Sequence, residues 1–244
     1  MRVGFDLDGV LADLHVPFVK AAIRLFPELD PSAITSADIG ASPVDEGQTE
    51  DAPPAAPPPD TRVPLTRAQS DAVWHYLATV EDFWEGLGEI EQGAIARLAA
   101  LADERRWEVL FITSRPRSAG RTVQRQSQRW LAKLGFPLPS VYVVHGSRGR
   151  IASALALDVV VDDRPENCLD IVLESKAGAI LVWRGDSAGV PASARRLGIA
   201  VVPTVADCLN ALVEAQQSGN ERGFLDRLRG LLGLKTTPAA ALRR

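Results

Sequence analysis

The stretch VGFDLDGVLAD, residues 3–13, decides the fold, because it places two carboxylates one residue apart where an apolar strand ends. Alternate side chains of an extended chain point to the same side, so Asp6 and Asp8 are expected to face one way. Gly9 then allows a tight turn away from them. Two like charges this close favour a hard divalent cation such as Mg²⁺, and one carboxylate oxygen remains to attack an electrophile. An ordinary surface turn is the simpler interpretation of Asp-Gly.

Two more clusters of polar residues follow apolar runs later in the chain. Residues 109–112 and 157–161 read as buried parallel strands. The polar residues that follow them are Thr113, Ser114, Arg115, Asp162 and Asp163. Open α/β sheets bind ligands at the carboxyl ends of their strands, so we expect these clusters and the first one to share a crevice. Taken singly, each is equally compatible with an exposed loop or a helix cap, and Asn167 is a candidate cap for the next helix.

Strands and helices alternate along most of the chain, which predicts a parallel, doubly wound α/β sheet. The expected strands are residues 2–7, 109–112, 141–144, 159–161, 179–183 and 200–202. The expected helices are residues 17–25, 66–87, 92–106, 118–133, 148–155, 167–174, 192–197 and 205–216.

The order of these clusters resembles the haloacid dehalogenase (HAD) superfamily of hydrolases, over about residues 1–212. Asp6 with Asp8, then Thr113, then Asp162 with Asp163 look like its first, second and fourth motifs. Within it, the chain is most similar to the 5′-nucleotidase and 5′(3′)-deoxyribonucleotidase branch. That narrower likeness rests on residues 6–13, 18–27, 83–87 and 162–165. The resemblance implies a Rossmann-like core with a small helical cap inserted after the first strand.

The resemblance also implies an aspartyl-phosphate mechanism. Asp6 would be the nucleophile, and Asp8 the acid/base that protonates the leaving oxygen and then activates water. Thr113 would donate a hydrogen bond to a phosphoryl oxygen. The Mg²⁺ ion would be held by Asp6, the main-chain carbonyl of Asp8 and Asp162, with Asp163 as a further ligand or beside one. Phosphoryl transfer depends mainly on such positioning and on positive charge near the equatorial oxygens.

The chain departs from the family in its third motif, which is a lysine shortly before the strand of the fourth. None of the four lysines in this sequence lies there. Arg148, at the start of an expected helix, is our first choice of replacement, and Arg150 is the second. Arginine also neutralises phosphate, but through a planar fork rather than a point charge. A catalytically weak module that binds a metal or ligand, or a partner, is therefore the alternative function.

Substrate contacts are expected from both sides of the crevice. Gly9, Ser114 and Arg115 are the candidates on the core side, and a solvated or salt-bridged arginine is the alternative for Arg115. Trp84 is the candidate for stacking on a nucleobase, and packing between cap and core is its alternative. Leu14 stands where deoxyribonucleotidases typically present an aromatic residue. A (deoxy)nucleoside monophosphate is thus one candidate among small phosphorylated substrates.

The expected domains follow from the same comparison. Residues 1–13 and 93–216 form the catalytic core, and residues 14–92 form a cap that excludes water and contacts substrate. Within the cap, residues 40–64 are rich in proline and acidic residues, which predicts a disordered insert; a ligand for a proline-binding module is the alternative. Residues 217–244 form an amphipathic segment and tail. For this segment, packing on the core or self-association as a homodimer is favoured over membrane binding.

Composition excludes several other classes of protein. A length of 244 residues, 46% hydrophobic and 24% charged, suits a soluble globular chain with one core and a small accessory domain. A net charge of −4 gives no support to binding of a nucleic-acid polymer. Two cysteines and the lack of a membrane-spanning or signal-peptide run indicate a cytoplasmic protein.

A third function remains open, namely a different reaction on the same fold, such as dehalogenation or phosphonate cleavage. Asp8 argues against dehalogenation, because a departing halide needs no proton. His15, His75 and His145 show no metal-ligand spacing and are expected to be structural or exposed.

Overall fold

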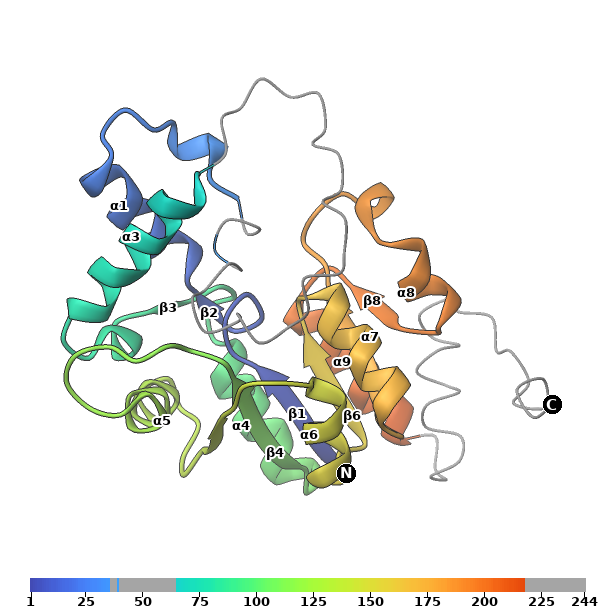
Figure 1. Cartoon of the computed structure of the whole chain (residues 1–244). Helices are drawn as coiled ribbons and strands as arrows, with labels where there is room; N and C mark the ends of the chain where they lie inside the picture. The colour runs from blue at the N-terminus through green and yellow to red at the C-terminus, as the bar shows by residue number, and fades with distance from the viewer. Residues whose placement is uncertain (36–38, 40–64, 218–244) are drawn as a thin grey trace.

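The computed structural model describes residues 1–35, 39 and 65–217 (Figure 1). Its strands are β1 (Arg2–Asp6), β2 (Ala12–Asp13), β3 (Gly88–Glu89), β4 (Glu108–Thr113), β5 (Ser140–Val143), β6 (Val159–Asp162), β7 (Gly178–Val182) and β8 (Ala200–Val202). Its α-helices are α1 (His15–Leu25), α3 (Arg67–Thr79), α4 (Ala94–Arg105), α5 (Val123–Lys133), α6 (Arg148–Ala154), α7 (Pro165–Glu174), α8 (Ala192–Arg196) and α9 (Val205–Gln217). Short 3₁₀ helices are η1 (Pro31–Ala33), η3 (Phe83–Glu85) and η4 (Ser187–Gly189).

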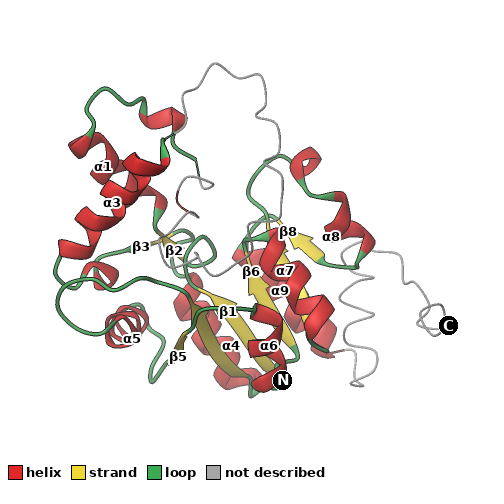
Figure 2. Ribbon diagram, viewed as in Figure 1, coloured by secondary structure: helices red, strands yellow, loops and turns green. Residues whose placement is uncertain are grey.

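Six of these strands form one parallel sheet in the order β5-β4-β1-β6-β7-β8, with helices between successive strands (Figure 2). The doubly wound, Rossmann-like α/β fold predicted from the sequence is therefore confirmed. The chain builds outward from β1 to β5 on one side and then crosses to β6 on the other. Such a reversal of strand order is where open α/β sheets bind their ligands.

The sheet is buried on both faces because successive side chains of its strands enter different cores. Val109 and Phe111 of β4 belong to one apolar cluster, which also takes side chains from α4, α5 and α9. Leu110 and Ile112 belong to a second cluster, which takes side chains from α6, α7 and α8. Each side chain of this size stabilises the fold by about 1.5–3 kcal/mol when fully buried. This explains the unbroken apolar runs in the sequence.

A long segment is inserted between β2 and β3, which close its two ends. These strands pair antiparallel, Ala12 with Glu89 and Asp13 with Gly88. Inside the insertion α1 and α3 pack together, at the upper left of Figure 1. The rings of Phe18 and Trp74 lie 5.4 Å apart between their centroids.

Two helices are shorter than predicted, because residues predicted to lie at their ends form loops that bind each other. The helix predicted over residues 66–87 ends at Thr79, and the one predicted from residue 118 begins at Val123. Asp82 lies between them with a left-handed φ of 49°, and its N–H donates to the carbonyl of Ala119 over 2.9 Å. Its carboxylate accepts from the N–H of Arg121 over 2.8 Å. These tertiary bonds replace the helical ones that the apolar pattern predicts.

Several sequence predictions concern residues outside the described ranges. They are the disordered insert at residues 40–64 and the amphipathic segment and tail after residue 217. Within the described ranges, no helix has both the length and the apolar character needed to cross a bilayer. Cys168 and Cys208 are both buried and unbonded to each other.

Candidate active site

Three neighbouring strands end in the polar residues that define the candidate site. Asp6 is the last residue of β1, Thr113 of β4 and Asp162 of β6, and all three are buried. Since the strand order is β4-β1-β6, these ends lie side by side at the carboxyl edge of the sheet. Asp8 joins them, because the Thr113 hydroxyl lies 3.4 Å from Asp8 Oδ2 and donates to it. The structure thus brings the three sequence clusters together.

Gly9 shapes the turn that follows the first two aspartates. Its φ is +82°, and a Cβ atom at this position would lie 1.9 Å from Asp163 Oδ2. The missing side chain therefore lets the Asp163 carboxylate approach the turn that carries Asp8. Gly9 was expected to contact substrate, and the role that the structure shows for it is this close approach.

Arg184 braces the same turn, which the sequence did not indicate. Its Nη1 donates to the carbonyl of Gly9 over 2.5 Å and its Nη2 to that of Val10 over 3.1 Å. Nη2 also bonds Glu91 Oε1 at 2.7 Å. Glu91 in turn accepts from the N–H of Val205 at the start of α9. Arginine at this β7 exit is one among many in the chain, so the sequence offered no signal that singled it out.

Arg148 lies beside the carboxylates that end β1 and β6. Its Nη2 donates to Asp6 Oδ1 over 3.2 Å, and its Nε is 3.9 Å from Asp162 Oδ2. Its side chain is 7% exposed, whereas that of Arg150 is 82% exposed and pairs with Glu174. Of the two arginines considered from the sequence, the structure therefore places Arg148 in the site and Arg150 outside it.

Close packing of α6 on α7 sets the position of Arg148. A Cβ atom on Gly149 would lie 2.3 Å from the carbonyl oxygen of Asp170, so only glycine permits this approach. The Gly149 N–H donates to Asp170 Oδ2 over 3.0 Å, and Ser147 caps the helix by accepting from the N–H of Arg150. These contacts fix the first turn of α6, and Arg148 is the first residue of that turn.

Asp162 is held by two partners on its own loop. The side-chain amide of Asn167 lies 3.0 Å from each carboxylate oxygen, and the N–H of Arg164 donates to Oδ1 over 2.9 Å. The sequence suggested Asn167 as a helix cap, and this is corrected: its amide instead orients Asp162. The buried carboxylate that needs a donor outcompetes a helix end that water can reach.

The carboxyl groups at this edge have raised pKa values, because they are buried close to one another. Burial, followed by repulsion from Asp162, raises the pKa of Asp6 well above its ordinary value, although Arg148 lowers it. Burial likewise raises the pKa of Asp162 against the lowering effect of Arg148. Burial and then repulsion from Asp162 raise the pKa of Asp163 to about 7. A further cation would stabilise the ionised forms.

The donor set fits a hard cation with oxygen ligands such as Mg²⁺. The groups that would hold it are the carboxylates of Asp6, Asp162 and Asp163 and the main-chain carbonyl of Asp8. Across residues 1–35, 39 and 65–217, no three His, Cys, Asp or Glu side chains already form a metal-ligating group. In this structure the guanidinium of Arg148 supplies the positive charge that Asp6 and Asp162 share.

Arg115 is buried and bound to Asp8, contrary to its expected contact with substrate. Its Nε and Nη2 donate to the two oxygens of Asp8, each over 2.8 Å. Its Nη1 donates to Ser127 Oγ over 2.9 Å, and the guanidinium lies over the rings of Trp84 and Trp130. The salt-bridged alternative considered for this residue is therefore the arrangement that the structure shows. Its neighbour Ser114 is half-buried and remains a candidate substrate contact.

Trp84 is also buried, which corrects the expectation that it stacks on a base. Its side chain is part of the core at 1% exposure, and its indole N–H donates to the carbonyl of Pro116 over 3.1 Å. Packing between the inserted segment and the core is the role its contacts show. His15 and His75 each bond a main-chain carbonyl, as expected of structural histidines.

No protein-family model and no curated protein matches this chain. Solved structures share its fold. A HAD family hydrolase from Deinococcus radiodurans R1, with bound phosphate and sodium, aligns with 20% identity and a TM-score of 0.51, covering 96% of this chain and 98% of that one. A hydrolase from Pseudomonas syringae aligns with 16% identity, a TM-score of 0.51 and coverage of 88% and 99%. A proposed phosphoglycolate phosphatase from Lactobacillus delbrueckii subsp. bulgaricus aligns with 13% identity and a TM-score of 0.52, covering 86% of this chain and 97% of that one. The chain therefore has the HAD-like fold over its core.

Proposed function

We propose that this protein is a HAD-type phosphomonoester hydrolase that acts on a small phosphorylated metabolite through an aspartyl-phosphate on Asp6. One observation carries the proposal: Asp6, Thr113 and Asp162 end three adjacent parallel strands, and Arg148 contacts two of them. The proposed nucleophile, a hydroxyl donor and a cation thereby lie together at the edge of the sheet where such folds bind ligands. The shared fold with HAD hydrolases, one of them with bound phosphate, adds support.

The first chemical step transfers the phosphoryl group to Asp6. A carboxylate oxygen of Asp6 forms a bond to phosphorus while the bond to the leaving oxygen breaks and Asp8 gives that oxygen a proton. The hydroxyl of Thr113 and the guanidinium of Arg148 stabilise charge on the equatorial oxygens. Bound Mg²⁺ would supply further positive charge to those oxygens and to the carboxylates.

The second step releases phosphate and restores the nucleophile. Asp8, now ionised, takes a proton from a water molecule. The oxygen of that water attacks phosphorus, and the bond between phosphorus and the Asp6 oxygen breaks. Phosphate leaves, Asp6 is again a carboxylate and Asp8 is again protonated. The two steps need no oxidant or second substrate, only water.

The substrate class is set by what the inserted segment leaves open, and the structure weakens the case for a base. Trp84 and Phe83 are buried and pack edge to face, with ring centroids 4.8 Å apart. Leu14, at the position where an aromatic residue would complete a stacking site, is buried as well. Nucleoside monophosphates are therefore one arm of the test, beside sugar phosphates and phosphorylated acids.

A second candidate function is a ligand-binding module without efficient turnover. The observation that favours it is the ion pair between Arg148 Nη2 and Asp6 Oδ1 at 3.2 Å, because a nucleophile held in an ion pair is less reactive. Turnover separates the two candidates.

The test is phosphate release with Mg²⁺ from nucleoside monophosphates, sugar phosphates and phosphorylated acids, with Asp6→Asn alongside. We expect release that EDTA abolishes and that Asp6→Asn lowers by at least about 10³-fold, since the nucleophile is lost. Asp158→Asn is the matched control, because that exposed aspartate bonds the Arg2 N–H at the opposite end of β6. Equal rates for the wild type and Asp6→Asn, or no release from any substrate, would overturn the phosphatase in favour of the binding module.

A further inference from the structure

We propose that Arg115 is a positioning residue, which holds Asp8 in the one orientation that its acid/base role requires. A buried cage of Trp84, Trp130 and Ser127 in turn holds Arg115. This inference rests on the proposed phosphatase function and adds to it a residue that acts on the leaving-group proton through another side chain.

Arg115 binds both oxygens of Asp8 without using all of their lone pairs. Oδ2 accepts from Arg115 Nε over 2.8 Å and from the Thr113 hydroxyl over 3.4 Å. Oδ1 accepts from Arg115 Nη2 over 2.8 Å. Each carboxylate oxygen has two lone pairs, and in the proposed reaction the single Thr113 proton passes to a phosphoryl oxygen, so the two Arg115 contacts then leave one lone pair on each oxygen of Asp8. The contact with Arg115 therefore fixes the carboxylate of Asp8 and still leaves a lone pair for the proton that it gives up and takes.

The two partners differ in what surrounds them. The side chain of Asp8 is 20% exposed, whereas that of Arg115 is 0% exposed. The carboxylate therefore opens to the crevice while the guanidinium lies wholly inside the protein. A two-point contact with a planar fork fixes the plane of the carboxylate as well as its position, which a lysine cannot do.

The cage prevents Arg115 from swinging away from Asp8. The guanidinium carbon lies 4.7 Å from the ring centroid of Trp84 and 5.4 Å from that of Trp130. Ser127 Oγ accepts from Nη1, the nitrogen that does not bond Asp8. The indole N–H of Trp130 donates to the carbonyl of Leu87 over 2.8 Å, so this wall of the cage is fixed as well.

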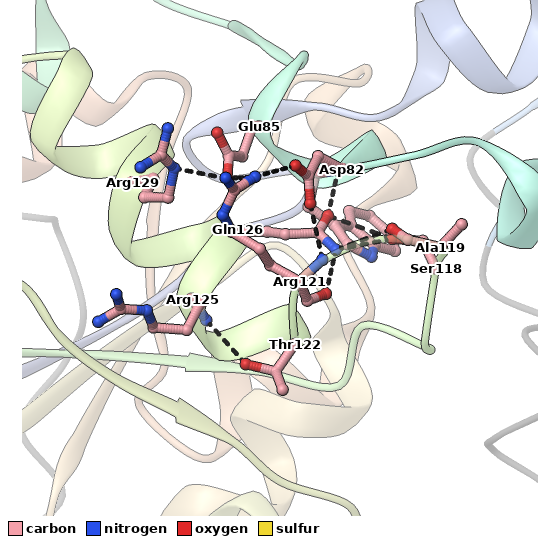
Figure 3. A network of polar contacts seen from close by, with 10 residues as sticks. Asp82, Glu85, Ser118, Ala119, Arg121, Thr122, Arg125, Gln126 and Arg129 are labelled. Atoms are coloured by element: carbon pink, nitrogen blue, oxygen red, sulfur yellow. Dashed lines mark hydrogen bonds and ion pairs between the residues drawn. The ribbon is translucent and has the colours of Figure 1, made fainter.

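Trp84, the other wall of the cage, is bound by a polar network around Gln126 (Figure 3). Gln126 Oε1 accepts from the N–H of Trp84 over 3.0 Å, and its Nε2 donates to the carbonyl of Arg121 over 2.5 Å. Asp82 bonds the N–H of Arg121, which ties η3 to the start of α5. The 3₁₀ helix η3 lies where the inserted segment returns to the core. The orientation of Asp8 therefore depends on how this end of the segment packs on α5.

The experiment separates positioning from simple structural support by varying the leaving group. An alkoxide needs a proton to depart, whereas p-nitrophenolate does not. The value of kcat/KM reports the steps up to departure of the leaving group. It is measured with p-nitrophenyl phosphate and with the alkyl phosphate that the wild type hydrolyses fastest, for the wild type, Arg115→Lys, Asp8→Asn and the double variant.

We expect Arg115→Lys to lower kcat/KM for the alkyl phosphate by about 10-fold or more, and for p-nitrophenyl phosphate by less than about 3-fold. In the Asp8→Asn background the same change should have no further effect on the alkyl phosphate, because Arg115 acts through Asp8. Arg129→Lys is the matched control, since this exposed arginine of α5 pairs with Glu85 away from Asp8, and it should leave both values unchanged.

Equal losses on the two substrates, or an undiminished effect of Arg115→Lys in the Asp8→Asn background, would overturn the inference and leave the phosphatase standing. Absence of all phosphate release by the wild type would instead overturn the proposed function, and this inference with it. Should Arg115→Lys fail to fold, Ser127→Ala decides, since it removes one anchor of Arg115 and adds no charge. It is expected to show the same selectivity for the alkyl phosphate, and equal effects on both substrates contradict the inference.

Discussion

Two buried arginines bind Asp6 and Asp8, the two aspartates that follow the first strand, and the two contacts differ in kind. Arg148 makes one contact with Asp6, at 3.2 Å, and shares its charge with Asp162 at 3.9 Å. Arg115 makes two contacts with Asp8, both at 2.8 Å. A single contact shared between two carboxylates can be exchanged for a phosphoryl oxygen, whereas a two-point contact inside a cage cannot. The comparison teaches that one side of the site is exchangeable and the other is fixed.

The fixed side is broken most severely by Trp84→Ala. Removing this buried ring takes away one wall of the Arg115 cage and leaves a cavity between η3 and α5. We expect the free energy of unfolding to fall by about 3–5 kcal/mol, as measured by urea denaturation. Leu138→Ala is the control, because that side chain is 96% exposed, and it should change stability by less than about 0.5 kcal/mol. A loss of under about 1 kcal/mol for Trp84→Ala would show that the cage is not well packed.

The exchangeable side is broken by Arg148→Ala, which removes the guanidinium that contacts Asp6, the proposed nucleophile. We expect kcat/KM for phosphate release to fall by about 10²–10³-fold, because charge on the phosphoryl oxygens loses its stabilising partner. Arg148→Lys should keep more activity than Arg148→Ala, since a point charge still reaches the site. Arg150→Ala is the control on the same helix, and a larger loss there than at Arg148 would contradict the assignment.

A third arginine sharpens the comparison, because Arg184 braces the backbone of the first-motif turn through Glu91. Burial raises the pKa of Glu91, but the N–H of Val205, the Arg184 guanidinium and the N–H of Ala206 together lower it by more, so the net pKa lies below its ordinary value. A carboxyl with a lower pKa in the folded state stabilises the fold above its unfolded pKa, and loses that effect as the pH falls through its folded pKa.

Glu91→Gln should therefore lower the free energy of unfolding by about 1 kcal/mol at pH 7, and by progressively less in more acidic buffer. Urea denaturation at several pH values measures this difference. Glu108→Gln is the control, because that carboxylate is 67% exposed in its pair with Arg2. A difference that grows as the pH falls would show that Glu91 is not stabilised as an anion.

Much of the fold could be predicted from the sequence, because the sheet is buried on both faces and its strands appear as apolar runs. The positions of Asp6, Thr113 and Asp162 followed from those runs, since each residue directly ends a strand. The break after Thr79 could not be predicted, because the bonds of Asp82 with Ala119 and Arg121 join segments that are distant in sequence. Local pattern favours a continuous helix there.

The partners of the arginines could not be predicted either. The sequence placed Arg115 two residues after Thr113, which suggested a ligand contact, and it gave no sign that Ser127 and Trp130 would enclose the guanidinium. These residues lie on one face of α5, and an apolar face normally predicts core packing alone. The sequence does not show that Arg115 binds Asp8 instead of a ligand. That contact appears only when the loops that follow β1 and β4 are placed together.

The most direct test of the central claim is a single-turnover reaction, quenched in acid, followed by mass mapping of the labile phosphoryl group. Borohydride reduction, which converts an aspartyl-phosphate to homoserine, marks the residue that carried it. We predict that the label appears at Asp6 within one turnover, disappears as phosphate is released, and is absent in Asp6→Asn. Release of phosphate by the wild type with no label at Asp6, or with the label on another residue, would contradict the assignment of Asp6 as the nucleophile.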